Sequence, residues 1–365
     1  MRADLTTAPR ASAAGAQLRV ERFDGTPAEW DAFVRRQPGW THFHLHGWRD
    51  VIGGVLRHDC PYLVARDATT GALAGVLPLV LVRSVLFGRY LVSLPFVNYG
   101  GPLGSAEAVR ALAAAAVARG EAAGVKLVEL RSRGPQPLDL PVSHRKITVV
   151  LDLPTEGPEA LMKRFPAKLR SQVRRPQKEG VTVRFGADQV APFFAVFARH
   201  MRDLGTPTQP ARLFEALMRT FPDDAWFGCA WLGDRPIACG AGFVWGDEFE
   251  MTWASALTEF NRIAPNMLLY WAFMERAMAA GLRRFNFGRC TPGGGTHRFK
   301  RQWGAEDEPL WWYQHAPGAP ADADATAVHT PSPDDGAYAW GPRLWKRLPL
   351  PVATALGPRI VRCIP

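Results

Sequence analysis

The stretch WFGCAWLGDRPIACGAGFVWGDEFEMTWA, residues 226–254, determines how the second half of this 365-residue chain folds. Its apolar and aromatic residues fall into three runs, and Gly-Asp pairs at 233–234 and 246–247 separate the runs. A glycine followed by aspartate between two apolar runs is typical of a tight hairpin turn. The stretch therefore predicts an antiparallel meander with strands at 226–232, 236–245 and 248–254.

The regions on both sides of the meander alternate between helical and strand-like patterns. A basic helix at 158–179, a strand at 181–185 and two more helices precede it, and a helix at 266–280 that ends at Gly281 follows it. Strands are expected next at 283–287 and 310–315. The first half has a similar order: a helix at 27–37, strands at 61–67, 72–83 and 90–95, a helix at 109–123, and strands at 125–131 and 146–153.

This order predicts an α/β (α+β) protein with mixed sheets flanked by helices in two similar domains. The boundaries that we predict are a disordered N-terminus at 1–16, domains at 17–155 and 156–316, a Pro/Ala/Asp-rich flexible linker at 317–340, and a basic apolar tail at 341–365.

The composition narrows the partners and the compartment. The net charge of +10 favours an anionic partner, with phosphorylated substrates, nucleic acid and acidic lipid all compatible. The five cysteines form no CxxC pair, which predicts reduced thiols in the cytoplasm and no metal site. The most apolar run, 73–94, is interrupted by Pro78, Arg83, Gly88 and Arg89, so we expect no membrane-spanning helix.

The basic segment 163–184 is the first candidate binding site. Arg170 and Arg174 are i,i+4 neighbours on the predicted helix, where two guanidinium groups can hold a phosphate or a carboxylate. A solvated helix face fits the same pattern equally well. Pro176 predicts a break or kink just before it.

The segment 255–269 is the second candidate. A polar loop leads into a helix that starts at about Pro265 or Asn266, and a helix start offers free N–H groups to an anionic donor. We therefore assign Arg262 and Asn266 to donor binding, although an ordinary helix started by proline explains the spacing at least as well.

The segment 283–304, RRFNFGRCTPGGGTHRFKRQWG, is the third candidate. Three glycines at 293–295 lead into a cationic and aromatic run in which Lys300 can stabilise the negative charge that develops on a carbonyl during acyl transfer. A Cys290 nucleophile paired with His297 lacks a third orienting group, so we interpret Cys290 as a packing residue at a strand end. A fourth candidate, LPFVNYGGPLG at 94–104, places Asn98 and Tyr99 in a turn that either faces substrate or only reverses the chain.

Several segments together resemble a known family. They are HLHGW (44–48), PFVNYGGPL (95–103), KLRSQVRRPQKEG (168–180), NRIAPNMLLYW (261–271), FNFGR (285–289), THRFKRQWGAEDEPLWW (296–312) and WKRLPLPVATALGP (345–358). The sequence resembles FemAB-like proteins with a BioF2-like acetyltransferase domain of the GNAT superfamily, in particular the subgroup that accompanies PEP-CTERM/exosortase systems. The resemblance covers nearly the whole chain.

The resemblance implies a tandem GNAT-like (acyl-CoA N-acyltransferase) fold and an enzyme that moves an acyl or aminoacyl group to an amine. The acceptor would be a cell-envelope, peptidoglycan-like or exopolysaccharide precursor, which is an anionic, phosphorylated molecule. The Phe-Lys pair of the family matches Phe299 and Lys300, with Lys300 as the catalytic residue. Substrate binding maps onto Asn98, Tyr99, Arg170, Arg174, Arg289 and Phe299.

Three questions stay open at this stage. The donor is either acyl-CoA or aminoacyl-tRNA, since the usual acetyl-CoA signature and the family's coiled-coil insertion are both absent. The general base is either the substrate itself or an acidic residue at 248–250. The alternatives to a cell-envelope acyltransferase are an acetyl-CoA-dependent N-acetyltransferase of a small molecule or surface protein, and a non-catalytic nucleic-acid binder.

The location follows from the tail. We expect a cytoplasmic protein whose segment 341–365, with five cations and no acid, either lies on the anionic cytoplasmic face of the inner membrane or packs on the second domain. Because this segment contains five prolines and two glycines, we expect no long regular helix in it.

Overall fold

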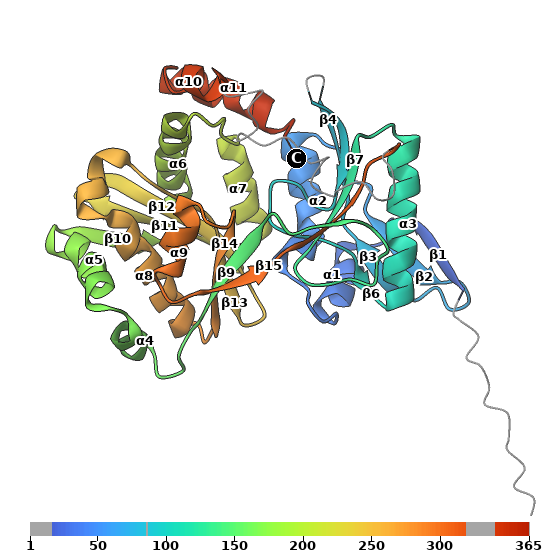
Figure 1. The fold of residues 1–365 in the computed structure, drawn as a ribbon, viewed down its shortest axis with the longest axis horizontal. Coiled ribbons are helices and arrows are strands. Elements are labelled where there is room, and N and C mark those ends of the chain that lie inside the picture. Colours follow the sequence, from blue (N-terminus) through green and yellow to red (C-terminus); the bar gives the residue numbers. More distant parts are fainter. Residues whose placement is uncertain (1–16, 85–86, 319–339, 365) are drawn as a thin grey trace, which may run out of the picture.

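A computed structural model describes residues 17–84, 87–318 and 340–364. The predicted disordered N-terminus and most of the predicted linker lie outside the described residues. Figure 1 shows two α/β halves side by side, with the C-terminal helices across the top of the second half.

The first half contains two sheets. One has the order β1-β2-β3-β6, and the other has the order β4-β5-β7-β16-β8. Helix α3 packs along the first of these sheets, and the two shorter helices α1 and α2 come before α3 in the chain. The bounds are β1 (Leu18–Arg22), α1 (Pro27–Arg35), α2 (Gly47–Val51), β2 (Leu63–Asp67), β3 (Leu73–Leu77), β4 (Val80–Ser84), β5 (Gly88–Val92), β6 (Leu103–Gly104), α3 (Ala106–Ala122), β7 (Leu127–Ser132), β8 (Val142–Ser143) and β16 (Trp311–His315).

The second half is built on one seven-stranded sheet with the order β10-β11-β12-β13-β14-β9-β15. Helices α5 and α8 pack against each other, and α6 and α7 also form a pair. The bounds are β9 (Ile147–Asp152), α4 (Pro158–Arg164), α5 (Ala167–Lys178), β10 (Val181–Phe185), α6 (Val190–Leu204), α7 (Ala211–Thr220), β11 (Ala225–Leu232), β12 (Arg235–Trp245), β13 (Glu248–Ala256), α8 (Pro265–Ala279), β14 (Arg284–Cys290), α9 (Gly295–Arg301) and β15 (Glu306–Pro309).

The predicted meander is confirmed. β11 pairs with β12 and β12 with β13, both antiparallel, and the two turns fall at the predicted Gly-Asp pairs. Gly233 and Gly246 have φ values of 59° and 54°, a backbone conformation that glycine adopts without steric cost.

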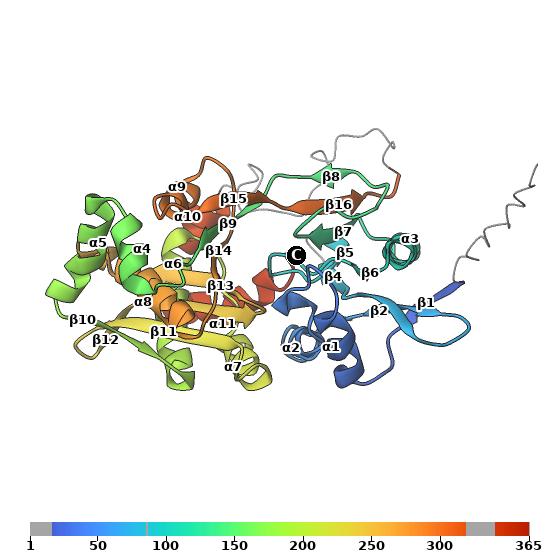
Figure 2. The same cartoon turned by 90° about the horizontal axis from the view of Figure 1, so that it is seen from below.

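Two strands connect the halves. β9 precedes all the other elements of the second half in the chain, and it pairs with β14 and β15 of the seven-stranded sheet. β16 comes after the second half and pairs with β7 and β8 of the first. The chain therefore crosses twice between the halves, as Figure 2 shows for β9, β15 and β16.

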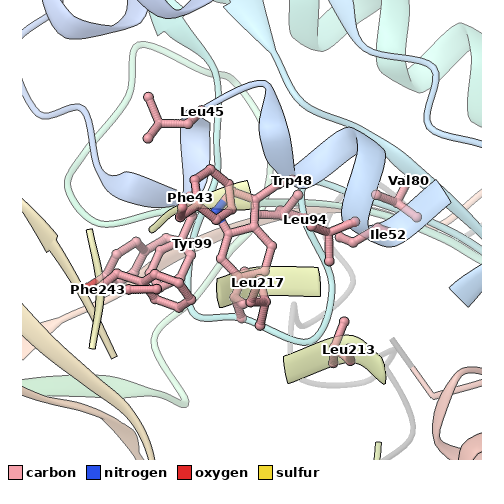
Figure 3. Packing of buried hydrophobic residues seen from close by; sticks show 14 of the residues in the cluster. Phe43, Leu45, Trp48, Ile52, Val80, Leu94, Tyr99, Leu213, Leu217 and Phe243 are labelled. Atoms are coloured by element: carbon pink, nitrogen blue, oxygen red, sulfur yellow. The ribbon is translucent and has the colours of Figure 1, made fainter. Parts of the chain in front are cut away.

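Aromatic side chains fill the junction between the halves. Phe243 of β12 lies 5.9 Å from Phe43 and 5.2 Å from Trp48 between ring centroids, and Tyr99 lies 5.4 Å from Phe43. Figure 3 shows these side chains, with Leu213 and Leu217 of α7 in the same cluster. Because one continuous core spans both halves, their separation would expose a large apolar surface.

Two predicted elements are wrong in their extent. The predicted strand 72–83 is interrupted at Pro78 and forms β3 and β4, which belong to different sheets. The predicted helix 158–179 divides at Pro166 into α4 and α5, whereas Pro176 lies inside α5. Proline disfavours the α conformation in the residue before it, and Phe165 at the end of α4 is extended, with ψ of 143°.

The tail packs on the second half. α10 (Trp340–Trp345) and α11 (Leu350–Val361) both contact α6. As expected, the tail forms no single long helix: α10 ends at Trp345, and α11 is a separate 12-residue helix with Pro351 in its first turn and Pro358 inside it. No described helix combines the length and the apolar character that a crossing of the bilayer demands.

Candidate functional site

The second-half sheet opens where β13 and β14 part. These neighbouring parallel strands pair only over three residues each, from Glu248 to Glu250 and from Arg284 to Asn286. The register of β12 against β13 shifts so that Thr252 is the extra residue of a β-bulge, just past the last paired residue. Beyond Glu250 and Asn286 the two described strands pair no further, and we call this end of the β13–β14 ladder the strand opening.

Glu250 lies at the vertex of the strand opening. Its side chain is fully buried and accepts hydrogen bonds from the Asn98 amide and the Tyr99 hydroxyl, both on the loop after β5. Asn286 of β14 donates to the same carboxylate at 3.3 Å and to the Tyr99 hydroxyl at 3.0 Å. Burial raises the pKa of Glu250 to about 7, against the hydrogen bond from Tyr99, which lowers it.

A second carboxylate, that of Glu248, lies two residues earlier on β13. Glu248 is buried and receives a two-pronged pair of bonds from Arg133, at 2.8 and 2.9 Å, and a third from Arg284 at 3.1 Å. Glu308 of β15 binds the same two arginines. These four residues fasten the first half to the sheet beside the strand opening, because Arg133 belongs to the first half and the others to the second-half sheet.

Lys300 enters the same region from α9. Only 3% of the residue is exposed, and its Nζ donates to the carbonyl oxygens of Gly288 at 2.5 Å and Arg289 at 3.0 Å. Burial lowers the pKa of Lys300 to about 8, the Glu250 carboxylate raises it and the Arg289 guanidinium lowers it. An ammonium group with two bonds to carbonyls retains a third N–H for another acceptor.

Gly288 makes this placement of Lys300 possible. Its φ is 73°, and a Cβ at this position would lie 2.6 Å from the carbonyl oxygen of Met251 on the opposite strand. The pairing of β14 with β9 is irregular between Asn286 and Arg289, which turns the Gly288 carbonyl out of the sheet and toward Lys300. The Gly288 N–H is held by the Asn286 side-chain oxygen at 2.8 Å.

Arg289 adds a partly exposed cation beside Lys300. Its guanidinium lies 5.1 Å from the centroid of the Trp312 ring, and Arg131 lies 4.4 Å from the same ring. Burial lowers the pKa of Arg289 to about 10, with a further contribution from Arg131. Among the described residues no hydrogen bond engages the Arg289 side chain, so its donors are available to an anionic group.

The structure places the other predicted site residues in three different ways. Phe299 packs against the rings of Tyr270 at 5.0 Å and Trp303 at 6.4 Å between centroids, and it thereby holds α9 against α8. Arg262 is exposed in a 3-10 turn at Thr258–Ile263. Asn266 lies in the first turn of α8, which has no side-chain cap. Both lie in the part of the chain that follows β13.

Arg170 and Arg174 lie apart from these residues on α5. Arg174 is exposed, and Arg170 donates to the Phe165 carbonyl at 2.6 Å, which caps α4. No described hydrogen bond or ion pair connects either arginine to Lys300 or Glu250. The structure therefore brings together Asn98, Tyr99, Arg289 and Lys300, and places Arg170 and Arg174 elsewhere.

Cys290 and His297 do not form a pair. Cys290 is buried, and burial raises the pKa of its thiol. His297 accepts from the Gly293 N–H at 3.0 Å and contacts Asp307 at 2.9 Å. A protonated, buried thiol fits the packing role that we expect for Cys290.

A cavity of about 600 Å³ lies on the other side of β9 and β15. Its walls include Arg164, Phe165, Arg284, Arg301 and Trp303, but neither Lys300 nor Glu250. We take the strand opening as the candidate site because the perturbed titratable groups lie there, whereas the cavity shares only Arg284 and Glu308 with the neighbouring ion-pair cluster.

Sequence reasoning left Glu250 as one of two open options and missed Asn286 and Gly288. Glutamates at positions i and i+2 of a strand, as at 248 and 250, place two carboxylates on one face of the sheet. This pattern can be recognised in the sequence. Their partners on the loop at 94–101 and on β7's end are more than 100 residues away in the chain, and no local pattern indicates them.

Comparison with known proteins gives the same fold. Residues 163–301 match the family described as Acetyltransferase (GNAT) domain. The crystal structure of FemX superposes with a TM-score of 0.59 at 15% identity, over 80% of this chain and 97% of that chain. L-PGS from Bacillus licheniformis gives a TM-score of 0.55 at 12% identity, over 93% of this chain and 98% of that chain.

A third structure is the C-terminal domain of a putative lysylphosphatidylglycerol synthetase from Agrobacterium fabrum, with a TM-score of 0.53 at 14% identity over 78% of this chain and 90% of that chain. No curated protein matches the sequence. The chain therefore has the mixed α/β, tandem GNAT-like fold that the sequence predicts, and the matched domain supports an N-acyltransferase enzyme.

Proposed function

We propose that this protein transfers an acyl or aminoacyl group to an amine of a cell-envelope precursor of the peptidoglycan or exopolysaccharide type. The observation that carries the proposal is Lys300, a buried ammonium group held by two carbonyls at the strand opening. A preorganised cation in a site that excludes water stabilises an oxyanion without reorganisation.

The proposed reaction uses the third N–H of Lys300. The amine nitrogen bonds to the carbonyl carbon of the donor, and the oxyanion that forms accepts from Lys300. The C–S bond of a thioester or the C–O bond of an ester then breaks, and the proton released by the nitrogen ends on the leaving sulfur or oxygen. The substrate thus supplies its own proton acceptor, because Glu250 is enclosed and its two oxygens already accept bonds.

Glu250 acts in this proposal as a positioning residue. Its negative charge favours the protonated form of Lys300, and it holds the loop with Asn98 and Tyr99 against the vertex. Arg289 would bind a phosphate or carboxylate of the acceptor next to Lys300, since its donors are available and partly exposed. Arg170 and Arg174 would bind a more distant phosphate on α5.

The donor would lie along the strand opening with its anionic part toward Arg262 and the start of α8. Uncapped N–H groups and the positive end of the helix dipole favour a negative group there. Acyl-CoA carries its pyrophosphate at the far end of the pantetheine arm from the thioester, and aminoacyl-tRNA carries a phosphate on the terminal nucleotide that bears the ester. The matched acetyltransferase domain favours a second candidate with the same site, acetyl-CoA-dependent N-acetylation of a small molecule or surface protein.

We further propose that the protein acts in the cytoplasm, in an exopolysaccharide pathway of the PEP-CTERM/exosortase type. The sequence segments named above support this subgroup.

The experiment that tests the function is a donor screen on the full chain. Thermal unfolding is followed with acetyl-CoA and with alanyl-tRNA, each against its non-acylated form, and with a uridine diphosphate sugar against uridine diphosphate. Stabilisation by acetyl-CoA alone would select the acetyltransferase candidate, and stabilisation by alanyl-tRNA would select aminoacyl transfer. If none of these ligands raises the unfolding midpoint at millimolar (or, for tRNA, micromolar) concentration, the proposal is wrong.

A further inference from the structure

The tail forms a surface in which exposed apolar side chains gather. Over the described residues, the large hydrophobic side chains that remain exposed are Leu204 at 52%, Leu344 at 57%, Val352 at 40% and Leu356 at 40%. Three of them belong to α10 and α11, and Leu204 ends α6, next to Gly205, which contacts Pro342 of α10. We call Leu204 with the outward residues of 342–364 the tail surface; Figure 1 shows it along the top of the second half.

Helix α11 has two distinct faces. Ala353 is 1% exposed and Gly357 is so close to Thr208 that a Cβ at 357 would lie 2.9 Å from the Thr208 nitrogen. The neighbouring face, about 100° around the helix, carries Val352 and Leu356, which are i,i+4 neighbours and are each 40% exposed. Small residues therefore seat the helix on the protein, and the larger apolar residues face outward.

The same surface is strongly basic. Five cations lie between residues 340 and 364, and this segment contains no aspartate or glutamate. Among the described ion pairs none includes any of these cations. The cations are Arg343, Lys346, Arg347, Arg359 and Arg362.

The tail surface is fixed in place at both ends. Arg202 of α6 donates to the Leu348 carbonyl at 3.1 Å, and His58 of the first half bonds to the Arg362 carbonyl at 2.8 Å. The His58 ring stacks on Phe96 at 5.8 Å, on the loop that carries Asn98 and Tyr99. The apolar side chains are thus presented by a helix attached to both halves, and folding alone leaves them in water.

We propose that the tail surface docks onto a bilayer rich in anionic lipid. The leucine and valine side chains would enter the boundary between headgroups and acyl chains, and the cations around them would contact the phosphates. A second copy of the chain does not fit this surface, because two-fold pairing would bring five cations against five. A soluble polyanion would satisfy the cations but leave the apolar side chains in water.

This inference goes beyond the proposed function, and its test requires no acyl donor or acceptor. The full chain is mixed with vesicles of phosphatidylcholine, with and without about 30% phosphatidylglycerol, and the bound fraction is measured by flotation. Two variants change the tail surface: Leu344→Ser with Leu356→Ser, and Arg343→Gln with Lys346→Gln and Arg347→Gln. The matched control, Arg110→Gln with Arg119→Gln and Lys126→Gln, removes three exposed cations on the far side of the first half.

The wild-type chain and the control should bind the anionic vesicles equally and the phosphatidylcholine vesicles weakly. Each tail variant should bind the anionic vesicles about tenfold or more weakly, as expected for the loss of several surface cations or of inserted side chains. Since all the altered side chains are exposed, the thermal unfolding midpoints should stay within a few degrees. Absence of binding by the wild-type chain, an equal loss in the control, or a dimer in solution that Leu356→Ser dissociates would each overturn the proposal.

Discussion

Tyr99 donates its hydroxyl hydrogen bond to Glu250, which lies 151 residues later in the chain and on the other half of the molecule. The bond joins the loop after β5 to the vertex of the strand opening. The Glu250 carboxylate raises the pKa of Lys300, so the hydrogen bonds that Asn98 and Tyr99 of the first half donate to Glu250 link that half to the proposed reaction centre. The shared aromatic core and the crossing strands β9 and β16 keep them so.

Removal of the Tyr99 hydroxyl should destabilise the protein. Tyr99→Phe leaves a buried carboxylate with one donor fewer, which costs about 1–3 kcal/mol in the free energy of unfolding. The measurement is urea unfolding of the variant and the wild-type chain. The matched control is Tyr62→Phe, since the Tyr62 hydroxyl is equally buried and has no hydrogen-bond partner among the described residues. Equal losses in both variants would show that the contact with Glu250 contributes nothing.

The alkaline limb of kcat should report the protonation of Lys300. The oxyanion requires the ammonium form, so kcat should fall as the pH rises through the Lys300 pKa of about 8. Glu250→Gln removes a charge that raises this pKa, so the limb should move to lower pH. Arg289→Gln removes a charge that lowers it, so the limb should move to higher pH. The measurement is kcat against pH for the three proteins, and movement in the same direction in both variants would contradict this assignment.

Alanine at Gly288 should damage both the fold and the site. The new Cβ would meet the Met251 carbonyl at 2.6 Å, and φ of 73° is itself unfavourable for alanine. We expect a loss of more than about 2 kcal/mol in the free energy of unfolding, because a backbone clash adds to the strain. Gly293→Ala is the control: its φ is 78° with nothing within 4 Å, so it should lose only about 1 kcal/mol. A loss at 288 no larger than that at 293 would exclude the clash.

Acid should loosen the loop that holds Asn98 and Tyr99. The buried His44 ring contacts the Gly101 carbonyl at 3.0 Å and accepts from the Thr41 N–H at 3.1 Å. Burial lowers the pKa of His44 to about 4, so the unfolded chain takes up this proton first as the pH falls below 6.5. The free energy of unfolding should therefore decrease by up to roughly 3 kcal/mol between pH 6.5 and 4.

The same unfolding series on His44→Gln gives the comparison. Glutamine does not titrate, so the variant should lose less stability over this pH interval even if it is weaker at pH 7. An equally steep decrease in the variant would assign the acid sensitivity to other groups, such as His58, whose pKa burial also lowers to about 4.

The sequence predicts the local elements well and their partners poorly. The meander at 225–256 has strands and turns within two residues of the predicted positions, because its periodicity and its Gly-Asp turns act over a few residues. No local sequence pattern predicts that β9 pairs in the second-half sheet and β16 in the first half. The apolar pattern of each strand predicts a buried strand but not the sheet to which it belongs. The division at 155 remains a prediction from composition.

Only the part of the candidate site that lies in one segment of the sequence could be predicted. Lys300 lies five residues after Gly295, so it and the glycine-rich stretch are found in one segment. Two partners of Glu250, Asn98 and Tyr99, lie on a loop of the other half, so the network depends on a contact that forms only after folding. The first basic helix, α4, ends before Pro166, whereas Pro176 lies inside α5. The buried side chains of Leu169 and Val173 hold α5 against the protein around Pro176.

The most direct test of the account is acyl transfer by Lys300→Ala. With the donor that the thermal screen selects, carrying a radiolabelled acyl group, the label that reaches the amine acceptor is counted in a single turnover. The variant should transfer about 100-fold or more slowly than the wild-type chain, as the loss of an oxyanion stabiliser predicts, with an unchanged donor-induced thermal shift. A variant that transfers at a near-normal rate would remove Lys300 from the mechanism and contradict the central claim.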